Sequence, residues 1–318
     1  MKKDKFKKSA HNTIDLQISA LKKLKQSVGN SFNQAVKAIG DCKSKTIFIG
    51  VGKSQKIASL ISSSLSSCAA ESYSLTAEDC VHGDLGSISS KDCVVIYSKS
   101  GSTKEILPVT NYCKRLGVTI IGITSKKKSA LYKAATIKIL IPDFKEGGEG
   151  GIVPSTSLIT QTSIGSSIVL AVMIYKNKGV KKLKRTHPAG SISKKLLTAE
   201  DLMVPTPFIS ENCIMKKALK VLSEKKLGLL VARNKKGMTG LIVDGDVKRA
   251  SQKNKNLHDL KVKDIMTKKP LSVDKDMLAI NALKLLNKKR ITSLLIRSIK
   301  KNRIIGVLHI HKVLENIQ

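Results

Sequence analysis

The stretch Cys93–Leu107 reads Cys-Val-Val-Ile-Tyr-Ser-Lys-Ser-Gly-Ser-Thr-Lys-Glu-Ile-Leu, and the expected fold is built outward from it. Its apolar run, residues 94–96, has the length and β-branched content of a buried parallel strand. A hydroxyl-rich turn with Gly101 follows, and a helical pattern begins near Glu105. Hydroxyls and free backbone N–H groups converge at such a junction, where the helix dipole favours negative charge. The stretch therefore predicts a phosphate site, with an ordinary capped turn as the alternative.

Strands and helices alternate on both sides of this stretch. One or two amphipathic helices are expected within residues 1–40. The strands are expected at residues 46–49, 72–75, 94–96, 118–124 and 137–141. Further helices are expected at residues 54–70, 103–116, 129–135 and 154–176. This alternation predicts an α/β fold, a doubly wound parallel sheet covered by helices on both faces, with ligands at the carboxyl ends of the strands.

A second glycine turn, Gly50-Val-Gly-Lys-Ser, follows the strand at residues 46–49. A P-loop would need glycine five positions before Gly52, but that residue is Ile47, so the nucleoside triphosphatase interpretation fails. What remains is a tight turn that places Lys53 and Ser54 at a helix N-terminus. Lys53 can then contact a ligand phosphate or carbonyl; the alternative is a surface lysine.

Two histidines lie in turns between the expected elements. His82 belongs to the polar loop 77–86, and His187 precedes Pro188 after a basic stretch. A lone histidine in a loop is usually uninvolved in chemistry, so both gain interest only from their neighbours. Glu146 lies in a glycine-rich loop, residues 145–151, just before the helix-start signal at Pro154.

The composition limits the classes of protein. The chain of 318 residues carries a formal charge of +35, but its lysines are scattered and aromatic residues make up only 3%. Because no basic stripe with interleaved aromatics is present, we expect no specific nucleic-acid partner, although a basic surface attracts anions. The six cysteines have no paired spacing, and Cys68, Cys93 and Cys113 have the surroundings of small core residues.

The same considerations bear on location. The basic N-terminus is followed by no apolar run, so it does not have the pattern of a signal peptide. The longest apolar run, residues 168–175, is too short to span a bilayer. With unpaired cysteines that suit a reducing compartment, we expect a soluble cytoplasmic protein without a membrane partner.

An internal repeat begins at Asp201. Asp201-Leu-Met recurs at residues 264–266, residues 218–222 recur at 282–286, and residues 240–243 recur at 306–309, about 64 residues apart. Each copy has the pattern helix, strand, strand, helix, which predicts two modules packed as a pseudo-symmetric pair. The expected domains are residues 1–200, then the repeats 201–260 and 261–318.

Together these motifs resemble a known family. They are Gly50-x-Gly-Lys-Ser, His82-Gly-Asp-Leu-Gly, Ser98-x-Ser-Gly-x-Thr-x-Glu, Pro154-Ser-x-Ser, His187-Pro and the repeat pair. From about residue 10 onward the chain is similar to sugar isomerase (SIS) domain proteins with a C-terminal CBS pair, most closely the D-arabinose 5-phosphate isomerases. The resemblance implies a flavodoxin-like SIS sheet with a tandem CBS module. It also implies interconversion of D-ribulose 5-phosphate and D-arabinose 5-phosphate for synthesis of Kdo, a sugar of lipopolysaccharide. Family members are cytoplasmic, often tetrameric, and need no metal or organic cofactor.

The resemblance also implies roles for individual residues. Aldose–ketose isomerisation moves a proton between C1 and C2 through an enediol(ate), and Glu105 matches the base. His187 would open the ring or shuttle protons, His82 would be a second polar catalytic group, and Lys53 would polarise the carbonyl. Glu146 matches an acidic family position. The residues implied for the substrate phosphate are Gly52, Ser54, Ser98, Ser100, Thr103 and Ser155.

Some positions leave alternatives open. Lys99 stands where the family is expected to have asparagine, so specificity is less defined than the family. Asp246 matches an acidic residue that often contacts a nucleotide ribose, whereas the second repeat has Lys312 there. A nucleotide is therefore expected at one CBS position, with a purely structural module as the alternative. For the whole chain, the alternatives are a phosphosugar isomerase of other specificity and a non-catalytic sugar-phosphate-binding regulator.

Overall fold

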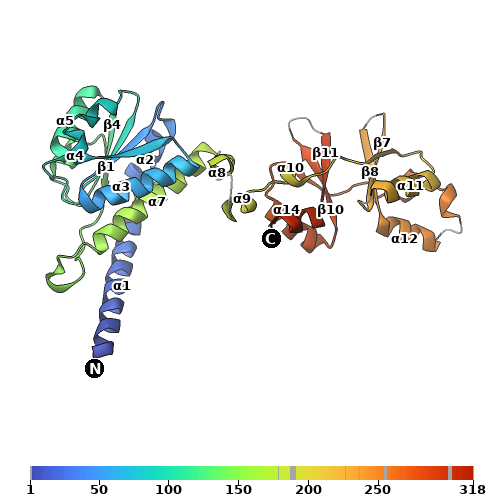
Figure 1. Ribbon diagram of the computed structural model, residues 1–318, viewed down its shortest axis with the longest axis horizontal. Helices are drawn as coiled ribbons and strands as arrows, with labels where there is room; N and C mark the ends of the chain where they lie inside the picture. The colour runs from blue at the N-terminus through green and yellow to red at the C-terminus, as the bar shows by residue number, and fades with distance from the viewer. Residues whose placement is uncertain are drawn as a thin grey trace. The chain divides into compact units, whose positions relative to one another are not determined.

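The computed structural model describes residues 2–177, 179–186, 191–225, 227–235, 237–253, 256–299 and 303–317. The chain divides into two compact units, Met1–Thr186 and His187–Gln318. Figure 1 colours the chain from blue to red, so the first unit is blue to green-yellow and the second is yellow to red. Each unit has its own sheet structure and its own buried core, and each is described separately.

The first unit contains the predicted parallel sheet. Its strands are β1 (Thr46–Gly50), β2 (Ser72–Thr76), β3 (Cys93–Tyr97), β4 (Thr119–Thr124) and β5 (Ile137–Leu140). They pair in the order β2-β1-β3-β4-β5, and every pairing is parallel. This is the flavodoxin-like order, in which the chain direction across the sheet reverses between β1 and β3. The doubly wound α/β prediction is confirmed.

Helices cover both faces of the sheet because successive strand residues point to opposite sides. On one face, Phe48 and Val95 join a core that includes residues of α2, α3 and α7. On the other face, Ile47 and Val94 join a core with residues of α4 and α5. The helices of the first face are α1 (Lys2–Ser27), α2 (Asn30–Asp41), α3 (Gly52–Cys68), α7 (Thr156–Lys176) and α8 (Gly179–Thr186). Those of the second face are α4 (Ala77–Cys80), α5 (Ile106–Leu116) and α6 (Ala130–Ala134), with short 3-10 turns at Asp84–Ser87 and Glu149–Gly151.

Local signals placed several of these boundaries correctly. Gly117 ends α5 with φ 74°, the left-handed conformation expected of a helix C-cap glycine. The helix begins at Ile106, three residues later than the predicted start at Thr103, because the Thr103 hydroxyl pairs with Ser98 in the preceding turn. Cys68, Cys93 and Cys113 are buried, as predicted for small core residues.

Helix α7 is longer than its apolar run suggested. It spans 21 residues with a mean hydropathy of 1.6, so by length and composition it is the one helix among the described residues that could cross a membrane. Its side chains Thr160, Gln161 and Ile164 are nevertheless buried against the sheet and the neighbouring helices. Core helices of soluble proteins pass the same test, and these contacts are those of a core helix.

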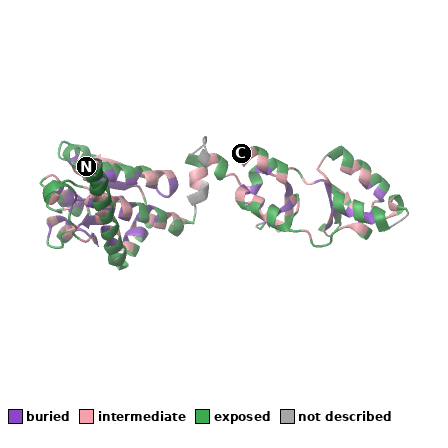
Figure 2. Ribbon diagram, turned by 90° about the horizontal axis from the view of Figure 1, so that it is seen from below, coloured by how far each residue is buried: buried purple, intermediate pink, exposed green. Residues whose placement is uncertain are grey.

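The second unit confirms the repeat as two three-stranded sheets. The first is β6 (Phe208–Ser210), β7 (Leu229–Asn234) and β8 (Gly237–Val243); the second is β9 (Ser272–Asp274), β10 (Ser293–Ser298) and β11 (Arg303–His309). In both sheets a short parallel strand joins an antiparallel hairpin. The helices are α9 (Ser191–Lys195), α10 (Ala199–Leu202), α11 (Met215–Lys225), α12 (Asp244–Lys253), α13 (Val262–Ile265), α14 (Ala279–Lys289) and α15 (Ile310–Ile317), with a 3-10 turn at Leu257–Asp259. Figure 2 shows the buried residues gathered inside this unit around its strands.

The head of each repeat packs against the other repeat's sheet. Leu202 of α10 belongs to the core formed with β9, β10 and β11, whereas Val262 of α13 belongs to the core formed with β7 and β8. A Cβ at Gly306 would lie 2.5 Å from the Met203 sulfur, and one at Gly240 would lie 2.6 Å from the Met266 sulfur. The two glycines therefore provide matching spaces for the methionines of the two Asp-Leu/Ile-Met motifs.

Candidate functional site

A pocket of about 490 Å³ lies at the carboxyl edge of the first unit's sheet. The residues that line it are Val51, Ser54, Tyr97, Ser98, Lys99, Ser100, Thr103, Lys126 and Asp143. They follow or end β1, β3, β4 and β5, so the parallel topology brings four separated segments to one place. This is where ligands bind in doubly wound sheets.

Hydroxyl groups form one wall of this pocket. Ser98 Oγ lies 3.0 Å from Thr103 Oγ1, which lies 3.4 Å from Ser100 Oγ. The Gly101 N–H donates to Ser98 Oγ at 3.0 Å. Three hydroxyls thus share two hydrogen bonds between them, which leaves at least one O–H proton free to donate to an anion.

Gly101 allows the turn to fold this tightly. Its φ is 63°, and a Cβ at this position would lie 2.2 Å from Ser129 Oγ and 2.7 Å from Thr124 Oγ1. The Thr124 hydroxyl in turn donates to the Lys99 carbonyl at 3.1 Å. The turn after β3 is therefore held against the end of β4, and only glycine fits at its centre.

The start of α3 provides the second wall. Gly52 has φ 54° and begins the helix, Lys53 is exposed, and Ser54 is half-buried in the pocket wall. The Ser54 hydroxyl donates to Gln161 Oε1 on α7 at 3.2 Å. A phosphate contact by Ser54 would thus require this O–H to turn away from Gln161.

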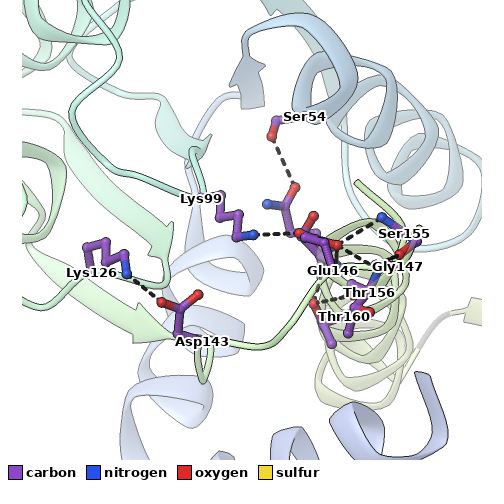
Figure 3. Close-up of polar contacts among 11 residues, drawn as sticks. Ser54, Lys99, Lys126, Asp143, Glu146, Gly147, Ser155, Thr156 and Thr160 are labelled. Carbon is purple, nitrogen blue, oxygen red and sulfur yellow. Dashed lines mark hydrogen bonds and ion pairs between the residues drawn. The ribbon is translucent and has the colours of Figure 1, made fainter. Parts of the chain in front are cut away.

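Lys99 and Glu146 connect the two sides of the site, as Figure 3 shows. The Lys99 ammonium lies 2.5 Å from Glu146 Oε1. Oε2 of the same carboxylate accepts the backbone N–H groups of Ser155 and Thr156 at 2.9 Å and of Ser157 at 3.1 Å. Glu146 is only 7% exposed. Its carboxylate therefore caps the N-terminus of α7 and neutralises a pocket lysine at the same time.

These contacts determine the charge of Glu146. Burial by itself would raise its pKa, but the Lys99 ammonium, the Ser157 side chain and the N–H groups of Ser155 and Ser157 hold the pKa down at about 2. Glu146 is therefore a carboxylate at neutral pH. A group with so low a pKa is a poor general base near pH 7.

A second ion pair lies in the same pocket and was missed from the sequence. The Lys126 ammonium pairs with the Asp143 carboxylate, and both side chains are about half exposed (Figure 3). Lys126 follows β4 and Asp143 follows β5. Because polar residues just after parallel strands share one edge of the sheet, this rule would have identified both of them, and Lys99 as well.

The remaining predicted site residues lie elsewhere. Glu105, half-buried, occupies the N-cap position of α5, and His82 is exposed in the turn after α4; neither lines the pocket. Among the described residues, none forms a hydrogen bond or ion pair with the side chains of Lys53, His82 or Glu105. The Ser155 hydroxyl accepts the Gly147 N–H at 2.7 Å and so shapes the loop before α7. His187 lies outside the described residues.

Asp246 in the second unit is buried and already has partners. Its Oδ2 accepts the Val243 N–H at 3.0 Å, and its Oδ1 pairs with the Arg249 guanidinium and lies 3.5 Å from the Thr267 hydroxyl. The carboxylate therefore stabilises the start of α12. A ribose would have to displace one of these contacts. A separate pocket of about 570 Å³ next to it is lined by Gly228, Asp244 and Lys248, among others.

Comparisons with known proteins agree with this architecture. The SIS domain family matches residues 39–172, and the CBS domain family matches residues 262–318. An uncharacterized protein of Rickettsia prowazekii, RP505, is 32% identical over 315 residues, which cover 96% of this chain and 95% of that protein. The arabinose 5-phosphate isomerase KdsD of Yersinia pestis is 28% identical over 314 residues, 97% of this chain and 95% of that protein.

A solved structure matches the first unit. The structure of E. coli CFT073 c3406 in complex with arabinose 5-phosphate is 28% identical with a TM-score of 0.57, and the match covers 59% of this chain and all of that one. The sheet order and the pocket at its carboxyl edge thus define a SIS-domain protein. More particularly, the chain belongs to the family of phosphosugar isomerases in which a SIS domain is followed by a CBS module, the family that includes KdsD.

Proposed function

We propose that this protein interconverts D-ribulose 5-phosphate and D-arabinose 5-phosphate through an enediol(ate). The observation that carries the proposal is the hydroxyl wall of Ser98, Ser100 and Thr103 at the switch point of a SIS sheet. Its dimensions suit a phosphate, and the lysines of the pocket supply positive charge. The KdsD relatives, similar over nearly the whole chain, support this choice of sugar.

The chemistry needs groups that move a proton between C1 and C2. We assign the base to Glu105, which lies two residues beyond the hydroxyl wall and whose side chain has no partner among the described residues. Lys53 would polarise the carbonyl from the first turn of α3. His82 and His187 would open the sugar ring or shuttle protons. Each assignment rests on the family pattern and on chemistry that these side chains can perform.

Glu146 and Ser155 take a different role in this proposal. A carboxylate with a pKa of about 2, bonded to one lysine and three backbone N–H groups, has little capacity to exchange protons with a substrate. We therefore assign Glu146 as a positioning residue that holds Lys99 toward the pocket. Ser155, bonded to Gly147, supports the same loop. Ser54, Ser98, Ser100 and Thr103, with the Gly52 turn, remain the phosphate ligands.

The setting of the reaction follows from the same relationship. We propose that the product supplies Kdo synthesis for lipopolysaccharide in the cytoplasm, and that the protein is a homotetramer. Apolar side chains exposed on α7, Leu170 at 60% and Ile174 at 79%, favour burial in an assembly, as do Phe6 and Ile14 on α1. Much of α1 is exposed in Figure 2. A nucleotide on the CBS module would bind beside Asp246.

The test is proton NMR of the purified protein with D-arabinose 5-phosphate in deuterated water. Ribulose 5-phosphate should form and deuterium should enter at C2 of the returned aldose, or at C1 of the ketose, depending on the face of transfer. Glu105→Gln should reduce turnover by at least two orders of magnitude, since a positioned base contributes about that much. Glu78→Gln, an exposed carboxylate on α4, is the matched control and should keep full turnover.

Two outcomes would contradict the proposal. Conversion of another pentose or hexose phosphate, but not of arabinose 5-phosphate, would replace the substrate while keeping the isomerase. Saturable binding without conversion of any of these sugars would indicate a regulator. Full turnover by Glu105→Gln would remove Glu105 as the base.

A further inference from the structure

A second polar pocket lies at the opposite edge of the first unit's sheet. It has a volume of about 490 Å³ and is bordered by Thr46 at the start of β1 and by the chain just after α2 and α3. Lys176 at the end of α7 and Lys182 and Arg185 of α8 complete its wall. β1 rises about 3.3 Å per residue, so its five residues put this pocket roughly 13 Å from the phosphate pocket at the other end of the strand.

The pocket is strongly cationic. Lys43, Lys176, Lys182 and Arg185 line it, against a single acidic residue, Glu71. The Lys176 ammonium donates to the Gly40 carbonyl at 3.2 Å and so has a structural role at the end of α2. In the described part of the chain, no carboxylate forms an ion pair with Lys43, Lys182 or Arg185. Three cationic groups therefore border one cavity, and the single carboxylate in its wall cannot balance their charge.

A buried hydroxyl in the wall points to a ligand independently of the charges. Thr46 is completely buried, and its Oγ1 has no hydrogen-bond partner among the described residues. Its backbone N–H is satisfied by the Glu71 carbonyl at 2.9 Å, so only the side chain is left without a partner. Buried hydroxyls are nearly always hydrogen-bonded, and one that borders a cationic cavity has an O–H to donate to an anion.

The environment of Lys182 is consistent with an anion at this place. Burial lowers the pKa of Lys182, Glu71 offsets part of this effect, and the Lys176 and Arg185 charges lower the pKa further. A bound anion would relieve the repulsion among these cations. The ends of α2, α3 and α7 near the pocket attract cations through their carbonyl groups, but this accounts for Lys176 and leaves the Thr46 hydroxyl unexplained.

We propose that this pocket is a second anion site, which binds a small molecule carrying a phosphate or diphosphate group through Lys43, Lys182, Arg185 and the Thr46 hydroxyl. Its ligand enters from the amino edge of the sheet and does not compete for the phosphate pocket at the carboxyl edge. The two pockets share β1, so occupancy of one can influence the other. The site stands independently of the proposed sugar specificity.

The test is calorimetric titration of inorganic pyrophosphate into the full-length protein in metal-free buffer. Two independent sites are expected per chain. Lys182→Ala combined with Arg185→Ala should weaken one of them at least tenfold and leave the other unchanged, while Ser98→Ala should weaken only the other. Thr46→Val, which keeps the side-chain shape, should weaken the first site several-fold. Lys114→Ala on α5 is the charge-matched control and should change neither.

Selenate soaked into crystals provides the location, since its anomalous signal should appear beside Thr46 in the wild type and disappear in the double variant. A single site that Ser98→Ala removes, with no effect of Lys182→Ala and Arg185→Ala, would overturn the proposal. If the double variant does not fold, Arg185→Ala alone, at an exposed position, carries the same test. Isomerase turnover in the same variants separates this result from the proposed function: their turnover without pyrophosphate should equal that of the wild type.

Discussion

The ammonium of Lys99 lies 2.5 Å from the carboxylate of Glu146, and this ion pair joins the turn after β3 to the N-terminus of α7. The two residues are 47 positions apart. Lys99 follows directly on Ser98 of the hydroxyl wall, while Glu146 carries the first N–H groups of a core helix. A change in either residue should therefore be felt both in stability and in the pocket.

Replacement of Glu146 by glutamine should destabilise the SIS unit by about 1–3 kcal/mol at pH 7, because a buried carboxylate with charge-assisted hydrogen bonds is lost. The pKa of Glu146 is depressed in the folded protein to about 2 from its ordinary 4.5. Its stabilisation is thus fully present above about pH 4.5 and is lost as the pH falls through about 2. Urea unfolding as a function of pH measures this, and the gap between wild type and variant should close at low pH.

The control for this prediction is Glu149→Gln, an exposed carboxylate in the same loop. It should change the free energy of unfolding by less than about 0.5 kcal/mol. Equal effects of the two substitutions would show that Glu146 contributes no more than an exposed loop carboxylate.

Replacement of Lys99 by methionine should remove the counter-charge of Glu146 and raise the pKa of that carboxylate. Lys99 is 38% exposed, so solvent screens part of the interaction and we expect a loss of about 1–2 kcal/mol. The double variant with Glu146→Gln should lose less than the sum of the two single changes, because the partners are in contact. Chemical denaturation of the four proteins gives the coupling; strictly additive losses would contradict a direct interaction.

Gly101→Ala should be more costly than a substitution that only forces positive φ. Left-handed backbone costs an alanine about 1–2 kcal/mol, and the new Cβ would also meet the Ser129 and Thr124 side chains. Gly117→Ala has similar φ, 74°, and nothing within 4 Å of its Cβ, so it isolates the backbone cost. The difference in melting temperature between the two variants measures the packing against β4, and Gly101→Ala should additionally raise KM for the phosphorylated substrate.

The exchanged heads of the two repeats can be tested at their glycines. Gly240→Ala should destabilise the second unit more than Gly306→Ala, because its Cβ would lie 2.8 Å from the Thr267 carbonyl as well as against Met266. At Gly306 the nearest atoms all belong to the flexible Met203 side chain. Partial rescue of Gly306→Ala by Met203→Ala, but not by Met266→Ala, in thermal unfolding would support the exchange; the reverse pattern would contradict it.

Much of the SIS architecture could be predicted from local sequence. Apolar β-branched runs such as residues 94–96 marked the strands, and their alternation with helical patterns required a parallel sheet. Gly117 was recognisable as a helix end, and the turn around Gly101 as an anion-binding junction. The pairing of Lys99 with Glu146 could not be predicted, because neither residue has a local signal for a partner 47 positions away.

The candidate site divides in the same way. Ser98, Ser100, Thr103 and Ser54 were identified from the sequence, and the structure brings all four to one pocket. Lys126 and Asp143 were missed because each is an ordinary charged loop residue until the strands are ordered side by side. The proposed roles of Glu105, His82 and His187 stay predictions.

The sequence by itself determined the element types, the parallel sheet and the repeat, because these follow from the spacing of apolar residues and from turn chemistry over short distances. Only the tertiary structure decided which charged groups meet, why Glu146 stays ionised with a pKa of about 2, and which repeat each methionine motif serves. Such contacts depend on the register of strands and on the paths of loops between distant segments. Their energies, unlike helix or strand preference, are fixed by distance and burial.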